Sequence, residues 1–218
     1  MIHLALTPTD TSGGDAAHAL AAGLNADGGM RSPARPFTIL TGGCAADAVV
    51  LGSVREAADA IGVALSAARS GRWAVGVLLG AEAEPAAVQV VVRRARRATA
   101  RCALEAGPPD PGGGGADADR SRQMAVAEAT LQLVAVLEQR RSPQQQEAGR
   151  LIESGASQRE AAQQLGVTQQ AVQARLRHGL WHETRTAVDA LLPLLQELAD
   201  GTDGGGGERA GSAQSVVS

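Results

Sequence analysis

One short segment in the C-terminal half of the chain is rich in glutamine, and three glutamines and two arginines fall on one face of the helix expected at its end. The segment reads SQREAAQQLGVTQQAVQARL from Ser157 to Leu176. Amide and guanidinium groups are the donors and acceptors that recognise base edges in the DNA major groove. On a helix from Gln169 to about Leu180, the face opposite Val172 and Leu176 would carry these groups without any carboxylate. That chemistry is typical of a DNA-recognition helix.

The capping residues of this segment predict a helix-turn-helix. Ser157 and Glu160 form a capping box, Gly166 suits the end of a first helix, and Thr168 can cap a second helix. The alternative is an ordinary helical hairpin with a solvated face, although Glu and Lys would be the usual residues there. We predict that the base edges are read by Gln169, Gln170 and Gln173, and that the phosphates are anchored by Thr168, Arg175 and Arg177.

A further helix is predicted just upstream, with Ser142 as its cap, Pro143 at its first position and Gln145 completing a second capping box. With this helix in place, the segment from Gln158 to Leu180 resembles the helix-turn-helix of sigma-factor region 4 and of LuxR-type regulators. The resemblance implies that the second helix of the motif enters the major groove.

The charge composition implies that any affinity for DNA comes from one region of the chain and not from the chain as a whole. The 218 residues carry a net charge of −3, and every basic residue except histidine is arginine. A pI near 5.8 argues against a binder that is basic throughout. Residues 140–185 contain seven arginines and four glutamates, a local balance of +3. We expect weak non-specific binding that depends strongly on salt.

Location and redox state follow from weaker signals. The start of the chain lacks a basic segment followed by an apolar run, and no apolar stretch reaches the length of a membrane span, so we expect a cytoplasmic protein. Cys44 and Cys102 have no neighbour at metal-ligand spacing, and we expect two reduced thiols.

Segments rich in glycine and proline divide the chain into separate regions. The run GPPDPGGGGADAD, from Gly107 to Asp119, cannot sustain a helix or a strand. We predict a first domain at 1–107, a linker at 108–120, a helical domain at 121–200 and a disordered tail at 201–218. The helix-turn-helix unit itself spans 143–180.

The first domain alternates extended and helical patterns. The expected strands are Ile2 to Leu6, Pro36 to Leu40, Asp47 to Leu51, Trp73 to Leu79 and Cys102 to Ala106. The expected helices are Asp15 to Leu24, a helix capped by Ser53 and Glu56 that runs through Arg69, and about Pro85 to Arg101. This order predicts a ferredoxin-like α/β sandwich, and the whole chain is therefore α+β, with an all-α helix-turn-helix domain after the sandwich.

With the segment RPFTILTGGCAADAVVLGSVREAADAIGVALSAARSGRWAVGV ahead of a linker and a helix-turn-helix, the chain resembles the SatD family of small bacterial proteins. The resemblance implies a first domain related to the nucleotide-cyclase palm. Catalysis by a palm needs two carboxylates that hold Mg²⁺. Here the hairpin reads Gly42-Gly43-Cys44, and Asp10 and Asp47 are the nearest acids. We expect no catalysis, no metal and no cofactor.

Two further features, an arginine-rich helix and two apolar stripes, each allow two interpretations of what they contact. The helix before the linker carries Arg93, Arg94, Arg96, Arg97 and Arg101, either as a solvated face or as a site for DNA or nucleotide phosphates. Apolar stripes over 121–139 and 188–198 either pack on each other or form a homodimer.

Together these features predict a sequence-specific DNA-binding transcriptional regulator that binds double-stranded DNA. A homodimer and a small-molecule or nucleotide effector are further partners, and no membrane is involved. The alternatives are a protein-interaction adaptor that uses the helical domain and a nucleotide-binding enzyme of the palm fold.

Overall fold

The computed structural model describes residues 1–10, 13–26, 33–40, 48–107 and 116–203. Within these ranges the chain is an α+β protein with five strands and eight helices. The first part consists, in chain order, of β1 (Ile2–Pro8), α1 (Gly13–Ala26), β2 (Arg35–Leu40), β3 (Val49–Val54), α2 (Ala57–Ser70), β4 (Trp73–Leu79), α3 (Pro85–Arg97) and β5 (Cys102–Ala106). This is the alternation of strands and helices that the sequence predicts.

The strands form one mixed sheet in the order β2-β3-β1-β4-β5. Neighbours among the first four are antiparallel, and β5 joins β4 in parallel. The central strand β1 is buried along its whole length. Side chains of a strand alternate between the two faces of a sheet, so β1 contributes to two separate cores.

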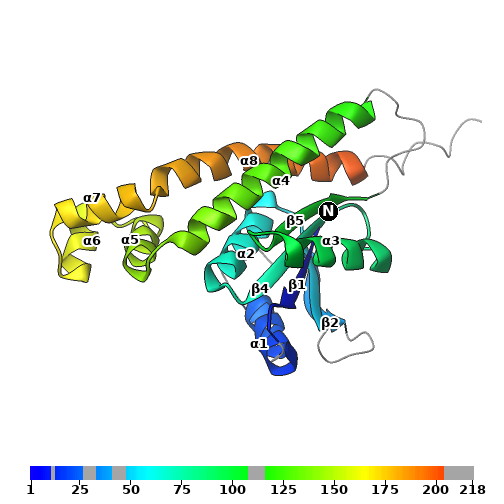
Figure 1. Cartoon of the computed structure of the whole chain (residues 1–218), viewed down its shortest axis with the longest axis horizontal. Helices are drawn as coiled ribbons and strands as arrows, with labels where there is room; N and C mark the ends of the chain where they lie inside the picture. Colours follow the sequence, from blue (N-terminus) through cyan, green and yellow to red (C-terminus); the bar gives the residue numbers. More distant parts are fainter. Residues whose placement is uncertain (11–12, 27–32, 41–47, 108–115, 204–218) are drawn as a thin grey trace, which may run out of the picture.

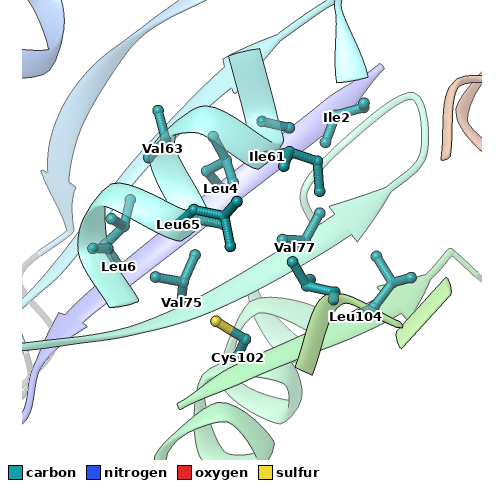
Figure 2. Close-up of a cluster of buried hydrophobic side chains, with 14 of the residues drawn as sticks. Ile2, Leu4, Leu6, Ile61, Val63, Leu65, Val75, Val77, Cys102 and Leu104 are labelled. Atoms are coloured by element: carbon teal, nitrogen blue, oxygen red, sulfur yellow. The ribbon is translucent and has the colours of Figure 1, made fainter. Parts of the chain in front are cut away.

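Helices cover both faces of the sheet. Ile2, Leu4 and Leu6 face the larger core, which α1 and α2 close. Figure 2 shows this core, with Ile61 and Leu65 of α2 above the strands. On the other face, α3 packs over β1, β4 and β5 through small residues and valines. Alanine, valine and leucine side chains predominate in both cores.

Two long helices form a stalk beside the sheet. They are α4 (Ala116–Arg140) and α8 (Trp181–Asp203), which run side by side (Figure 1). Leu131 of α4 and Leu195 of α8 are buried in the same core as the sheet and α2. The apolar stripes of these helices are therefore covered within the chain, by each other, by α2 and by the sheet.

The segment between the stalk helices forms a separate unit. It comprises α5 (Pro143–Glu153), α6 (Gln158–Leu165) and α7 (Gln169–His178). These three helices lie at the end of the stalk that is remote from the sheet (Figure 1). Their buried side chains form a core of their own around Trp181.

The predicted cap at Ser53 is wrong. Ser53 lies in β3, and its hydroxyl is 2.7 Å from Nδ1 of the buried His3. Helix α2 begins after Glu56, whose side chain makes no capping bond. Instead, the backbone N–H of Ala57 donates to Oε1 of Gln196 in α8 at 2.9 Å. A tertiary contact takes the place of the local motif.

Several element ends also differ from the prediction. Helix α3 ends at Arg97, and Arg101 adopts a left-handed backbone with φ 53°. Residues 116–120, predicted as linker, form the first turns of α4, where Arg120 donates to the carbonyl of Leu198 at 3.1 Å. Helix α8 continues through Pro193 and past 200 to Asp203. The rest of the predicted linker and tail lies outside the described residues.

Candidate nucleic-acid interface

Local capping builds α6, the turn and α7 as the sequence predicts. The hydroxyl of Ser157 accepts from the N–H of Glu160 at 3.2 Å, and the Glu160 carboxylate accepts from the N–H of Ser157 at 2.8 Å. Gly166 ends α6 with φ 63°, a conformation that favours glycine. Thr168 then caps α7, because its Oγ1 accepts from the N–H of Ala171 at 3.1 Å.

The unit has a small core that fixes the rotation of α7. Val172 and Leu176, four residues apart, are fully buried against Trp181. On α5, Gly149 leaves room for that indole, because a Cβ atom there would lie 2.1 Å from Cζ3 of Trp181. Because these contacts fix the rotation of α7 about its own axis, they also fix which of its side chains face away from the core.

The opposite face of α7 carries the predicted contact residues. Gln169, Gln170, Gln173 and Arg177 are exposed, and Thr168 is exposed at the start of the helix. Arg175 is half-buried at the edge of the face. Helix α7 itself holds no Asp or Glu, so its outer face offers amide and guanidinium groups with no competing carboxylate.

Sequence reasoning missed the residue that holds this unit on the stalk. Arg141, between α4 and α5, has a side chain only 1% exposed and forms an ion pair with Glu138. Its Nε donates to the carbonyl of Gly179 at 2.7 Å, and its Nη2 donates to Oγ1 of Thr184. Its guanidinium carbon also lies 4.5 Å from the centre of the Trp181 ring. We call this side chain the Arg141 clamp.

The Arg141 clamp joins the end of α4 to the turn between α7 and α8. Burial lowers the pKa of Arg141, and the carboxylate of Glu138 opposes that change. Leu180, in this turn, has a left-handed backbone with φ 49°, an arrangement that surrounding contacts must hold in place. An arginine just before a helix that Ser142 caps gives no local sign of such a role.

Glu160 provides a pH-dependent test of the α6 cap. Its pKa lies below the ordinary 4.5, because the backbone N–H and then the side chain of Ser157 bond to its carboxylate. A depressed pKa means that the charged form stabilises the fold, and this contribution is lost as the pH falls through the pKa of the folded state. We expect an NMR titration of Glu160 to have its midpoint below 4.5. Ser157→Ala removes the hydroxyl but keeps the backbone N–H, so the midpoint should rise by the smaller part that the hydroxyl supplies. Equal midpoints in the two proteins would show that the Ser157 side chain does not act on Glu160.

The arginines of α3 do not lie beside the recognition helix. Helix α3 covers the sheet, whereas α7 lies at the remote end of the stalk (Figure 1). Arg93 and Arg97 are exposed on one face of α3. Arg101, which is predicted on the same helix, lies beyond its end and donates to the carbonyl of Gly71 at 2.9 Å. The prediction that this helix carries Arg101 is therefore wrong.

Most of the residues of the predicted palm site lie outside the part of the chain that the structure describes. Asp10 is exposed just after β1, and Gly42, Gly43, Cys44 and Asp47 lie outside the described residues. Within the described ranges, no three His, Cys, Asp or Glu side chains are grouped as metal ligands. Burial raises the pKa of the Cys102 thiol to about 12, so this group stays protonated at neutral pH. No helix in the described part of the chain is both long and apolar enough to cross a bilayer.

Comparison with protein families, with curated proteins and with solved structures finds no match for this chain. The features of this protein that indicate a function are therefore the exposed face of α7 and the contacts that hold α7 on the stalk.

Proposed function

We propose that this protein is a sequence-specific DNA-binding protein of the transcriptional-regulator class, which inserts α7 into the major groove. The observation that carries the proposal is the outer face of α7, where three exposed glutamines and Arg177 project from the remote end of the stalk. Gln can bond an adenine with two hydrogen bonds. The likeness to sigma-factor region 4 and LuxR-type helix-turn-helices belongs to this proposal.

Each residue has a role in the proposed complex. Gln169, Gln170 and Gln173 read base edges, while Arg175 and Arg177 bind phosphates. Thr168 already accepts a hydrogen bond as the cap of α7, and its hydroxyl proton remains able to donate to a phosphate oxygen. Contacts to phosphate set the position of the helix, and contacts to bases select the sequence.

The first domain acts in this proposal as a sensor or assembly module without catalytic activity. The antiparallel order β2-β3-β1-β4 supports a ferredoxin-like classification of its sheet, with β5 as an added edge strand. A SatD-like identity remains part of the same proposal. In a homodimer, two copies of α7 would lie about 34 Å apart, one DNA turn.

Selection of bound fragments from random duplex DNA, using the full chain, tests the proposal. We expect an enriched motif that contains adenine, and a two-fold symmetric motif if the protein binds as a dimer. An adaptor that contacts only proteins would shift no duplex even at low salt. A nucleotide-handling palm enzyme would instead show turnover that depends on Mg²⁺.

Gln173→Ala is expected to relax the sequence preference at one position of the motif. Loss of a two-bond contact to a base removes about 1–3 kcal/mol of discrimination. Competition binding with matched and mismatched duplexes measures this difference. Gln144→Ala, an exposed glutamine on α5, is the matched control and should leave the preference unchanged. An equal loss of affinity for all duplexes would show that Gln173 does not read a base.

Arg177→Ala is expected to weaken binding to every duplex to a similar extent. Removal of one phosphate contact lowers the slope of log affinity against log salt by about 1. Titrations at several salt concentrations measure this slope. Arg55→Ala removes an exposed arginine just before α2 and should leave the slope unchanged. An unchanged slope in Arg177→Ala would place its side chain away from phosphate.

A further inference from the structure

A groove lies on the face of the sheet that carries α3. Helix α3 covers β1, β4 and β5, and the space between α3 and the neighbouring strands β2 and β3 is a cavity of about 970 Å³. Its residues are Thr7, Ile39, Leu40, Val49, Pro85, Val88, Gln89, Val92, Arg93, Arg96 and Arg97. The volume is at the upper end of the range for pockets that hold small organic molecules.

The charged groups of this groove are all positive. Arg93 and Arg97, one helical turn apart, are exposed, and neither has a hydrogen bond or ion pair among the described residues. Arg96 donates to the buried Thr7 hydroxyl at 2.7 Å, which holds its guanidinium against the sheet. The lining contains no Asp or Glu. An anionic group would meet several donors here without a competing carboxylate.

The remainder of the groove is apolar. Leu40 and Val49, which pair across β2 and β3, lie on the strand side, and Val88 and Val92 lie on the helix side. The Leu40 side chain is 42% exposed. An apolar surface next to arginines fits a molecule that has both an apolar body and an anionic head.

We propose that this groove binds an amphipathic organic anion, whose phosphate or carboxylate head contacts Arg93 and Arg97 and whose apolar body covers Leu40, Val49 and Val92. The residues that carry the site are ordinary side chains of α3 and of the sheet, and binding needs no metal ion. The site is independent of the surface of α7.

The same helix connects the groove to the stalk. Arg94, on another side of α3, donates to Glu105 at 2.5 Å and to Glu128 of α4 at 2.7 and 2.8 Å. Oε1 of Glu128 also accepts from the backbone N–H of Leu104 at 3.2 Å. A shift of α3 on ligand binding would therefore act on α4, and through α4 on α7. This regulatory step rests on the proposed function.

The experiment titrates the full-length protein with anilinonaphthalene sulfonate, an aromatic anion that fluoresces in apolar sites. We expect saturable binding of one dye molecule per chain. Arg93→Glu/Arg97→Glu should weaken binding by roughly tenfold or more, as expected for the loss of charge-assisted contacts. Arg55→Glu/Arg140→Glu changes the charge equally at exposed positions and should bind as the original protein does. Equal weakening in the two double variants would overturn the site.

A second variant tests the site without changing its charge. Gln89 is exposed on α3 and lines the groove, so Gln89→Trp should fill the groove and exclude the dye while the circular dichroism spectrum stays the same. Dye binding that survives both Gln89→Trp and the Arg93/Arg97 change would overturn the proposal.

Displacement of the dye identifies the class of anion. Release by decanoate indicates an acyl carboxylate, and release by ATP without Mg²⁺ indicates a nucleotide, and either result supports the proposal. Inorganic pyrophosphate should be a poor competitor, because it has no apolar body. Release by pyrophosphate as readily as by the other two would overturn the amphipathic assignment.

Failure of the regulatory step and failure of DNA binding give different results. If the anion binds but leaves the affinity for the selected duplex unchanged, the coupling through Arg94 is overturned and the site stands. If no duplex binds at all, the proposed function fails, while the dye titration still decides the groove.

Discussion

Arg141→Met is expected to lower the free energy of unfolding by about 3–5 kcal/mol, the usual effect of removing one partner of a buried ion pair. Glu138 is the reason, because its side chain is only 7% exposed and one of its oxygens bonds to Arg141. Its other oxygen has no hydrogen-bond partner among the described residues, and Nε of Arg69 is 3.8 Å away. Without Arg141 the carboxylate would be left with this one distant cation. Urea denaturation measures the loss.

A double-mutant cycle separates the charge pair from simple packing. Glu138→Gln/Arg141→Met removes the charge that would be left alone, and we expect it to be more stable than Arg141→Met. Arg150→Met makes the same replacement at an exposed position of α5 and should change stability by less than about 0.5 kcal/mol. If the double variant were no more stable than Arg141→Met, the unpaired carboxylate would not be the cause.

The Arg141 clamp also bears on the proposed DNA contact. Because its donors hold the carbonyl of Gly179 and the hydroxyl of Thr184, it fixes the angle at which α7 leaves α8. A recognition helix must be held rigidly for several base contacts to form together. We therefore expect Arg141→Met to weaken specific binding at temperatures where the sheet remains folded.

Features that depend on adjacent residues could be predicted from the sequence. The caps at Ser142, Ser157 and Thr168 and the left-handed Gly166 each involve residues within four positions, so the local sequence specifies them. The buried face of α7 follows from the spacing of Val172 and Leu176. For the same reason the exposed positions of the three glutamines agree with the prediction.

Features that depend on distant residues could not be predicted. Ser53 and Glu56 have the spacing of a capping box, but pairing of β3 with β1 places Ser53 in the sheet instead. Arg141 contacts residues about forty positions away, and no local pattern distinguishes it from the exposed Arg140 beside it. The stripe on α4 showed that the helix needs a partner. The fold shows that α8 and the sheet cover this stripe within the chain, which the spacing of the apolar residues could not specify.

The groove beside α3 illustrates the same limit. The run of arginines was visible in the sequence, but its members have different surroundings in the fold. Arg94 pairs with Glu128 of α4, Arg96 bonds Thr7 of β1, and only Arg93 and Arg97 are directed to a ligand in our proposal. Apolar residues on the strand side of the groove come from β2 and β3, about fifty residues earlier in the chain. A charge pattern alone could not have joined the two halves.

Trp181→Ala is expected to unfold the helix-turn-helix unit while the sheet stays folded. The core of this unit is small, and Trp181, only 4% exposed, is its largest buried side chain. Replacing a buried tryptophan by alanine lowers stability by about 3–5 kcal/mol. The other buried residues of this core, three alanines, Val172 and Leu176, offer little surface to compensate, and the indole also lies beneath Arg141.

Hydrogen exchange of the backbone amides tests this prediction, because it reports the stability of each element separately. Amides in α5, α6 and α7 should lose protection in Trp181→Ala, whereas those in β1 and β4 keep it, since the sheet has its own core. Trp181→Phe retains an aromatic ring under Arg141 and should show a smaller effect. An equal loss of protection in the sheet would mean that the two cores unfold as one, and that the recognition helix cannot melt alone. Loss confined to α5–α7, together with loss of DNA binding, would show that the small core around Trp181 is what holds the glutamines of α7 in position.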